Sequence, residues 1–296
     1  MGVTGFAFEA IGTHWKIEIE DTLSTGQRDS VLQQVLERIQ AFDRDYSRFR
    51  ADSLVAEMSL ASGTYHLPPD AEPMFRLYQE AYQLTEGAVT PLIGQVLVDA
   101  GYDATYSLIS RELHHPPSWE EVMDFQAPQT LVMKRPVLLD VGAFGKGYLI
   151  DIVAALLVKE GVQRFCIDAG GDVLHRDSAG GLLRVGLENP LNTNQVIGVA
   201  TISNRSICGS AGNRRAWGTY HHIINPHTLM SPRDIVGTWA AASTTLLADA
   251  MATCLFFANP DTLLRYYSFD YLVMYADTSV TASQGFPQEL FGARTR

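Results

Sequence analysis

The stretch from residue 140 to residue 151 constrains the fold of this chain more than any other. An apolar run ends in Asp140, glycines surround a single lysine, Lys146, and the pattern of an amphipathic helix follows at once. Glycine lets a backbone approach a ligand closely, and a helix N-terminus presents unpaired N–H groups with a partial positive charge. The stretch therefore predicts a junction that holds phosphate groups. The alternative is a tight β–α turn whose glycines serve packing alone, and this stretch by itself does not decide between the two.

The net charge limits the partners that the chain can have. The 296 residues carry a formal net charge of −11, and no segment shows a basic run that would offset repulsion by phosphate. We therefore expect neither nucleic acid nor an anionic membrane surface as a partner. No apolar stretch approaches the length needed to cross a bilayer, so we expect no membrane span.

The N-terminal sequence and the cysteines indicate a compartment. The first twenty residues show neither a basic leader nor a long apolar region, which favours a cytoplasmic protein unless a leader has been trimmed. The three cysteines, Cys166, Cys208 and Cys254, lie far apart without C-x-x-C spacing. An odd number in that arrangement favours reduced core thiols over a disulfide framework or a zinc site.

Apolar spacing predicts three long helices. Residues 26–45 place apolar side chains near helical spacing, and residues 71–85 do the same with Pro73 in the first turn. Residues 148–161 form the third, with Gly161 expected at the C′ position just beyond the helix.

Strand-like sequence surrounds these helices. Residues 6–20 alternate in polarity, residues 129–142 resemble a hairpin-like pair of strands, and residues 164–177 and 182–188 are again strand-like. Residues 104–128 are typical of loops and short helices. Strands with interspersed helices predict an α+β fold with mixed sheets flanked by helices.

A second glycine turn runs from Asp168 to Asp172, with the sequence D-A-G-G-D. Two glycines flanked by carboxylates are able to line a nucleotide cleft, and they also suit an ordinary turn or bulge. If the neighbouring strands pair in one sheet, this turn and the one near Lys146 would lie at corresponding ends of adjacent strands.

Asp249 and Thr253 lie four residues apart in an Ala- and Leu-rich stretch that should be helical. Their oxygens therefore share one helix face, where burial is costly unless they are paired. Mg²⁺ takes oxygen ligands of this kind and completes its shell with water and phosphate. A satisfied core pair is the alternative, and the helix pattern alone favours it.

Two adjacent histidines, His221 and His222, precede an Asn-Pro turn. On a short strand one of them faces inward and the other outward. A histidine can act as a general base toward a hydroxyl near neutral pH, but a hydrogen-bonded structural histidine is more common. Periodicity cannot choose between the two residues.

Four motifs occur here in an order that matches one protein family. Residues 140–151 match D-x-G-A-I-A-K-G-Y-x-x-D, residues 169–172 match A-G-G-D, residues 222–226 match H-I-I-D-P with Asn225 for the usual Asp, and residues 248–253 match A-D-A-x-x-T. The chain thereby resembles the ApbE family, the FAD:protein FMN transferases, over nearly its whole length. The resemblance implies an ApbE-like fold and an enzyme that binds FAD with Mg²⁺ and transfers FMN to a Thr or Ser hydroxyl of an acceptor protein, releasing AMP.

The resemblance also assigns roles to the residues that carry the chemistry. Lys146 and the helix N-terminus would hold the pyrophosphate. Asp249, Thr253 and the backbone carbonyl of Ala143 would ligate Mg²⁺. His222 would receive the proton of the acceptor hydroxyl. A metal, a lysine and a base are a sufficient set for phosphoryl transfer, which depends mainly on positioning and charge neutralisation.

Flavin contacts are implied at three further places. Asp140 and the backbone at Ile223 would contact the flavin nucleotide. Tyr46 matches an aromatic position expected to pack on the flavin, and a core tyrosine is the alternative. These contacts rest on the resemblance alone.

The segment G-x-F-D-P-T of the family is altered here. Residues Ala88, Val89 and Thr90 would contact the nucleotide, but Val89 replaces Phe, Thr90 replaces Asp and Leu92 replaces Thr. The contact is therefore either lost or moved from side chains to the backbone.

The change in sequence pattern at residue 129 divides the chain into two parts, and the resemblance names its partner. Residues 1–128 would form a mixed α+β part that contributes flavin contacts, and residues 129–296 a nucleotide- and metal-binding part, with one compact unit as the alternative. The family's acceptor motif resembles D-x-x-[ST]-G-A-T, which this sequence lacks, so the acceptor should be a separate protein. An FAD pyrophosphatase giving FMN and AMP, and a flavin-binding protein without turnover, are the competing interpretations.

Overall fold

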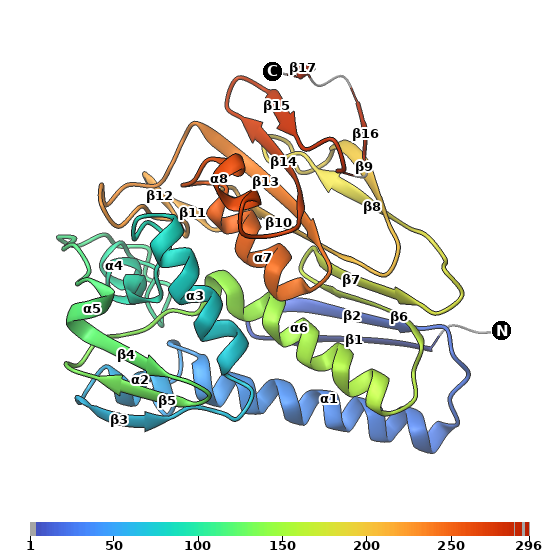
Figure 1. Ribbon diagram of the computed structural model, residues 1–296, viewed down its shortest axis with the longest axis horizontal. Helices are drawn as coiled ribbons and strands as arrows, with labels where there is room; N and C mark the ends of the chain where they lie inside the picture. Colours follow the sequence, from blue (N-terminus) through green and yellow to red (C-terminus); the bar gives the residue numbers. More distant parts are fainter. Residues whose placement is uncertain (1–3, 287, 292–293, 296) are drawn as a thin grey trace.

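A nine-stranded sheet forms the centre of the fold in the computed structural model, with the long helices in front of it (Figure 1). The structure describes residues 4–286, 288–291 and 294–295. In spatial order the strands are β1 (Thr4–Ala10), β2 (Thr13–Ile19), β6 (Arg164–Ala169), β7 (Asp172–Asp177), β10 (Ser206–Ala211), β13 (Ile235–Ala242), β14 (Asp270–Tyr275), β15 (Ser279–Ala282) and β17 (Arg294–Thr295). Neighbouring strands are antiparallel, apart from the parallel pair β15 and β17.

Two tight turns divide the predicted strand regions into hairpins. Residues 6–20 contain most of the hairpin of β1 and β2, which turns at Gly12 with a φ of 72°, and residues 164–177 fold as β6 and β7 with Gly170 at a φ of 65°. Both glycines have a left-handed backbone that is unfavourable for other residues. The two turns meet, because a Cβ on Gly170 would lie 2.1 Å from the hydroxyl oxygen of Thr13.

Four helices pack on one face of the sheet. They are α1 (Thr25–Tyr46), α3 (Glu72–Leu84), α6 (Gly142–Lys159) and α7 (Thr245–Cys254). The three predicted long helices are confirmed. Ser24 begins α1 with a capping box to Gln27, and Gly161 follows α6 with a φ of 87°, as expected of a C′ glycine. Helix α6 begins at Gly142, so Lys146 lies inside the helix rather than before it.

The second strand predicted within residues 129–142 is wrong. β5 (Thr130–Met133) pairs with β3 (Gly63–His66) and β4 (Met123–Gln126) in a separate three-stranded sheet, and residues 134–141 contain no strand. Pro136 lacks the N–H donor that a ladder needs. Instead, the N–H groups of Val137 and Asp140 donate to the carbonyls of Met58 and Pro91 at 3.2 and 2.8 Å. Asp140 therefore enters α6 from a loop and not from the end of a strand.

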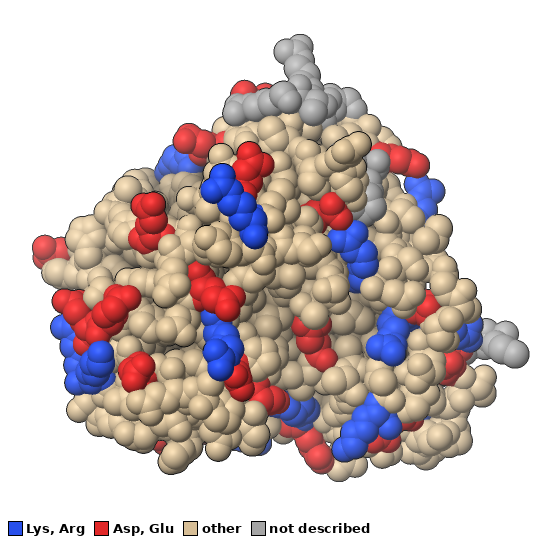
Figure 2. Space-filling model, viewed as in Figure 1, with Lys and Arg blue, Asp and Glu red and all other residues tan. Residues whose placement is uncertain are grey.

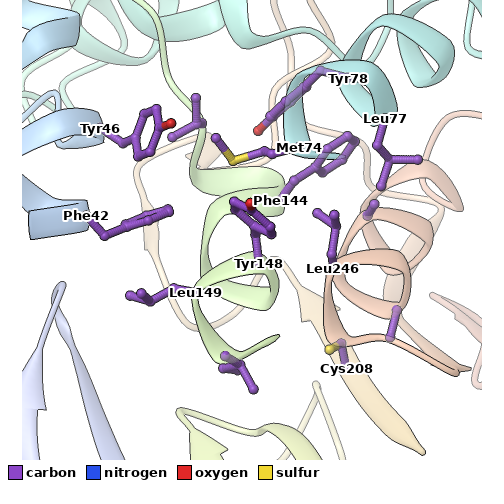
Figure 3. Packing of buried hydrophobic residues seen from close by; sticks show 14 of the residues in the cluster. Phe42, Tyr46, Met74, Leu77, Tyr78, Phe144, Tyr148, Leu149, Cys208 and Leu246 are labelled. Carbon is purple, nitrogen blue, oxygen red and sulfur yellow. The ribbon is translucent and has the colours of Figure 1, made fainter. Parts of the chain in front are cut away.

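Successive side chains of a strand point to opposite faces of the large sheet, so the sheet has a hydrophobic core on each face. On β10 the side chain of Cys208 packs on the helix side and that of Ile207 on the opposite side, and on β13 Ala240 and Trp239 divide in the same way. The helix-side core is shown in Figure 3, where Tyr78 of α3 lies beside Phe144 of α6. These two rings are stacked at 4.0 Å between centroids.

A second, smaller sheet covers the opposite side. It consists of β16 (Gln288–Leu290), β9 (Val196–Ile202) and β8 (Leu183–Glu188), in that order. Apolar residues of β8 and β9 join the cluster that contains Trp239. The strand predicted at residues 182–188 is thus confirmed as β8.

The remaining elements are short and surround the helix side. They are α2 (Leu54–Met58), the 3₁₀ turn η1 (Pro91–Ile93), α4 (Gly94–Asp99), α5 (Trp119–Val122), α8 (Pro260–Leu264), and the ribbon of β11 (Ala216–Trp217) and β12 (Tyr220–His221). The ribbon and α4 share a third apolar cluster, which contains Trp217.

The fold is α+β, as predicted, and the sheet crosses the boundary placed at residue 128. β2 pairs with β6 along its length, so strands from residues 1–128 and 129–296 share one sheet. Among the residues described, no helix is long and apolar enough to cross a membrane. The face shown in Figure 2 has acidic and basic side chains interspersed.

Candidate functional site

A cavity of about 380 Å³ lies where α6, α7, the segment before η1 and the β11–β12 ribbon meet. Its size is within the range of small-molecule sites. Of the eleven residues to which the resemblance assigns a role, ten line this cavity: Ala88, Val89, Thr90, Asp140, Ala143, Lys146, His222, Ile223, Asp249 and Thr253. The fold thus gathers into one lining residues that are widely separated in the chain.

Helices α6 and α7 approach each other closely beneath the cavity. Gly147 makes this possible, because a Cβ there would lie 2.4 Å from the carbonyl oxygen of Thr245 and 2.5 Å from the Cβ of Asp249. The N–H of Gly147 donates to the Asp249 carboxylate at 2.7 Å. The sequence left open whether the glycines of this stretch serve a ligand or packing, and in the structure Gly147 packs the helix that carries Lys146 against the helix that carries Asp249.

Asp151 orients the same pair of helices. Its two carboxylate oxygens accept from the N–H groups of Thr245 and Leu246, each at 2.8 Å. These are orphan donors of the first turn of α7, and a carboxylate there also suits the helix dipole. The last residue of the predicted motif therefore positions α7, a role that sequence analysis did not foresee.

A charged cluster occupies the floor of the cavity. Lys146 forms an ion pair with Asp172, which is fully buried and also accepts from the N–H of Gly209 at 3.3 Å. Asp249 is 5% exposed, and its burial together with the nearby Asp172 carboxylate raises the pKa of Asp249 to about 8. Burial alone would lower the pKa of Lys146, but the carboxylates of Asp172 and Asp249 outweigh burial and raise it.

The cluster has one negative charge in excess when all three groups are ionised. Two carboxylates face one ammonium, so a cation bound to Asp249 would relieve the repulsion that raises its pKa. Among the described residues no three His, Cys, Asp or Glu side chains gather as a metal site. A cation here would therefore need carbonyl and hydroxyl oxygens, such as those of Ala143 and Thr253, and such a mixed set suits Mg²⁺.

The structure separates the two histidines. The ring Nε2 of His221 lies 3.0 Å from the carbonyl oxygen of Pro232, and its backbone N–H donates to Ser231, so His221 is held in the fold. His222 lines the cavity, and its buried Nδ1 has no hydrogen-bond partner. Burial, helped by the charge of Arg215, lowers the pKa of His222 to about 3. A histidine that is neutral at pH 7 can accept a proton.

Asp140 is already paired. It forms an ion pair with Arg48, whose side chain is 2% exposed, and it accepts from the N–H of Gly142 at 2.7 Å. Arg48 also donates to the carbonyl oxygen of Tyr102 at 2.8 Å. Sequence analysis missed Arg48, which lies in the same D-Y-S-R-F run as Tyr46.

Residues 88–90 line the cavity, and hydrogen bonds hold this segment in place. The N–H of Val89 donates to the Thr85 hydroxyl at 3.0 Å, and the Thr90 hydroxyl accepts from Leu92 at 3.2 Å to cap η1. Because the Thr90 side chain serves as a cap, the arrangement favours a ligand contact through the backbone.

Tyr46 is the one predicted residue that does not line the cavity. It belongs to the helix-side core beside Phe42 (Figure 3), and the centres of the two rings lie 4.8 Å apart. Tyr46 lines a neighbouring pocket instead. Phe49 lines the cavity in its place and stacks on Tyr106 at 5.5 Å. The helical spacing of Phe42 and Tyr46 was the signal that could have placed Tyr46 in the core.

Comparison with known proteins agrees with this architecture. The model of the ApbE family matches residues 11–273. The FAD:protein FMN transferase of Treponema pallidum is 26% identical over 317 residues, covering 93% of this chain and 85% of that protein. The FAD:protein FMN transferase of Escherichia coli K12 is 24% identical over 285 residues, covering 88% of this chain and 79% of that protein.

Solved structures show the same fold. The ApbE protein from Thermotoga maritima superimposes with a TM-score of 0.84 at 18% identity, over 97% of this chain and 100% of that one. The flavin transferase ApbE from Vibrio cholerae gives a TM-score of 0.80 at 17% identity, over 96% of this chain and 98% of that one.

Proposed function

The chain belongs to the ApbE family, and from that membership we propose that it transfers FMN from FAD to a Thr or Ser hydroxyl of an acceptor protein and releases AMP. One observation carries the proposal: a single cavity is lined by a lysine, a carboxylate and hydroxyl on one helix, and a neutral histidine. The names of the relatives support the same activity for this chain.

His222 is the base in this proposal. The acceptor hydroxyl oxygen attacks the phosphorus of the FMN half, the bond from that phosphorus to the bridging oxygen breaks, and AMP leaves with that oxygen. The hydroxyl proton passes to the ring of His222, which is neutral at pH 7 and whose buried Nδ1 has no hydrogen-bond partner.

The charged floor is the place for the pyrophosphate and for Mg²⁺. Asp249, Thr253 and the carbonyl of Ala143 would hold the ion, which when bound offsets the charge of the phosphate oxygens. Lys146 adds a cation on the same floor, held by Asp172 so that its ammonium needs little reorganisation. The excess negative charge of the two carboxylates supports a cation at this position.

Contacts to the rest of FAD follow from the walls of the cavity. Asp140, which is paired with Arg48, and the backbone of Ile223 would bind the flavin nucleotide, and residues 88–90 form another wall of the cavity. Phe49 takes the aromatic position that the sequence assigned to Tyr46, because its ring lines the cavity.

The test is mass spectrometry of an acceptor that carries an Asp-x-x-Thr-Gly-Ala-Thr segment, after incubation with the protein, FAD and Mg²⁺. We expect the acceptor to gain one FMN and an equal amount of AMP to appear by chromatography. FMN and AMP with unmodified acceptor would identify an FAD pyrophosphatase instead. Unchanged FAD would leave a flavin-binding protein without turnover.

A matched pair of variants tests the metal assignment. Asp249→Asn keeps the shape of the side chain and an acceptor for Gly147 but removes the charge, so Mg²⁺-dependent transfer should be lost while the thermal unfolding midpoint is kept. Asp29→Ala removes an exposed carboxylate of α1 and serves as the control. Full Mg²⁺-dependent activity in Asp249→Asn contradicts the assignment.

A further inference from the structure

Arg215 and His222 face each other at the open end of the β11–β12 ribbon. The ribbon pairs Ala216 with His221, so the next pair outward is Arg215 and His222, and the N–H of His222 donates to the carbonyl of Arg215 at 3.1 Å. Both residues line the cavity. A cation and the proposed base are therefore neighbours by backbone register.

The ribbon is anchored to the rest of the fold, and this anchoring fixes the position of the Arg215 backbone. The indole N–H of Trp217 donates to the carbonyl of Ala100 at 2.7 Å, and its ring stacks on Tyr102 at 5.6 Å. Trp217 is 8% exposed. The Arg215 guanidinium lies over the same Tyr102 ring, 6.0 Å from its centre.

Arg215 has no carboxylate partner, unlike the three other arginines at the cavity and its neighbouring pocket, of which Arg50 pairs with Asp43 and Asp52. Arg214 forms a two-pronged pair with Glu188 at 3.1 and 2.6 Å, and Arg48 pairs with Asp140. Among residues 4–286, 288–291 and 294–295, no ion pair joins Arg215 to Asp or Glu. In a chain of net charge −11, a solvent-exposed arginine without a carboxylate partner is a local site for an anion.

The position of Arg215 suits an anion that arrives with the acceptor. Its side chain lines both the cavity and a second pocket of about 360 Å³, which Phe49 and Tyr106 also line. Because Arg215 and His222 are backbone neighbours that both line the cavity, an acceptor segment whose hydroxyl reaches His222 also comes within reach of Arg215. The guanidinium fork is suited to bind a carboxylate through two hydrogen bonds.

We propose that Arg215 binds a carboxylate of the acceptor protein, close in sequence to the hydroxyl that receives FMN, and so determines which acceptor is modified. The proposal rests on the transferase function above. It makes Arg215 a specificity-determining residue, separate from the phosphate-binding floor. A phosphate of FAD is the other anion that the same guanidinium chemistry could bind, and the experiment separates the two.

The experiment measures steady-state transfer with two acceptors, one with the Asp of the Asp-x-x-Thr-Gly-Ala-Thr segment and one with Asn in its place. For Arg215→Ala we expect KM for the Asp acceptor to rise by about tenfold or more, the size typical of a charge-assisted hydrogen bond. KM for FAD should stay unchanged. The Asn acceptor should show the same raised KM with the unaltered enzyme and no further rise with Arg215→Ala.

Charge reversal and a control complete the design. The Arg215→Glu variant should lose activity toward the Asp acceptor and gain activity toward an acceptor with Arg at that position. Arg233→Ala removes an arginine that donates to the ribbon at Thr219 but does not line the cavity, and it should behave as the unaltered protein. Thermal unfolding midpoints check that every variant is folded.

The possible outcomes separate failure of the Arg215 inference from failure of the proposed transferase function. If the unaltered protein transfers no FMN to the Asp acceptor, the proposed function and the role of Arg215 are both refuted. If it does transfer FMN and Arg215→Ala raises KM for FAD instead, the arginine binds a phosphate of FAD and the inference is overturned. Equal KM values for both acceptors with the unaltered enzyme also overturn it.

Discussion

Replacing Gly147 by alanine should push α6 and α7 apart and weaken the site that they share. The new Cβ would lie 2.4 Å from the carbonyl oxygen of Thr245 and 2.5 Å from the Cβ of Asp249, whereas ordinary contact begins at 3.4 Å. Neither atom is the end of a flexible side chain. The gap of 3.4 − 2.4 = 1.0 Å must therefore be opened by moving one helix relative to the other.

Two opposing terms set the size of the effect. Overpacking of this kind destabilises the fold by about 1–3 kcal/mol. Alanine in place of glycine inside a helix stabilises the helix by roughly 0.5–1 kcal/mol. The free energy of unfolding should fall by about 1–2 kcal/mol in total, which lowers the unfolding midpoint by several degrees. Function should suffer more than stability, because α7 carries Asp249 and Thr253 and a displacement of about 1 Å is enough to spoil a preorganised site.

The assay combines urea denaturation with the Mg²⁺ dependence of FAD turnover. Gly26→Ala is the matched control, because a Cβ at Gly26 in α1 meets nothing within 4 Å. The control should unfold at the same urea concentration as the unaltered protein or a higher one. If Gly147→Ala keeps both its stability and its Mg²⁺ dependence, the close approach of the helices is not what holds the site together.

Three further predictions concern the base, the metal and the helix cap. His222→Gln should slow transfer by about 10²–10⁴-fold, as expected for loss of a general base, while FAD affinity measured by fluorescence stays the same; an equal loss of both makes His222 a binding residue. Because burial and Asp172 raise the pKa of Asp249 to about 8, its proton must leave before a cation binds, so Mg²⁺ affinity measured by calorimetry should rise with pH from 6 to 8 and level off above; a flat profile contradicts this. Asp151→Ala leaves two N–H groups of α7 without their partner and should lower the free energy of unfolding by about 1–3 kcal/mol in urea, with no change expected for the exposed Asp29→Ala.

Local pattern predicted the elements of this fold well where the pattern is repeated over many residues. The helices at residues 26–45, 71–85 and 148–161 were all recognised, because an amphipathic helix repeats its apolar face every few residues and each repeat adds to the signal. Gly161 marked the end of α6 for an equally local reason, the left-handed backbone that follows a helix.

Prediction failed where a short apolar run has a partner elsewhere in the chain. Residues 136–140 have the composition of a strand, yet they lie as a loop whose N–H groups donate to Met58 and Pro91. For Tyr46 both a flavin contact and a core position were open, and the structure shows it in the core beside Phe42 while Phe49 lines the cavity.

The sequence by itself determined the types of chemical group available and the order in which they occur: a lysine in a glycine-rich helix start, an Asp and Thr one helical turn apart, and a histidine before an Asn-Pro turn. These are local features, and local spacing is enough to recognise them. The motif match had assigned His222, but only the tertiary structure showed that it lines the cavity and His221 does not, that Asp172 holds Lys146, and that Arg48 holds Asp140. Each of these pairings joins residues from different elements, and one-dimensional periodicity says which face a residue occupies but not which distant residue that face will meet.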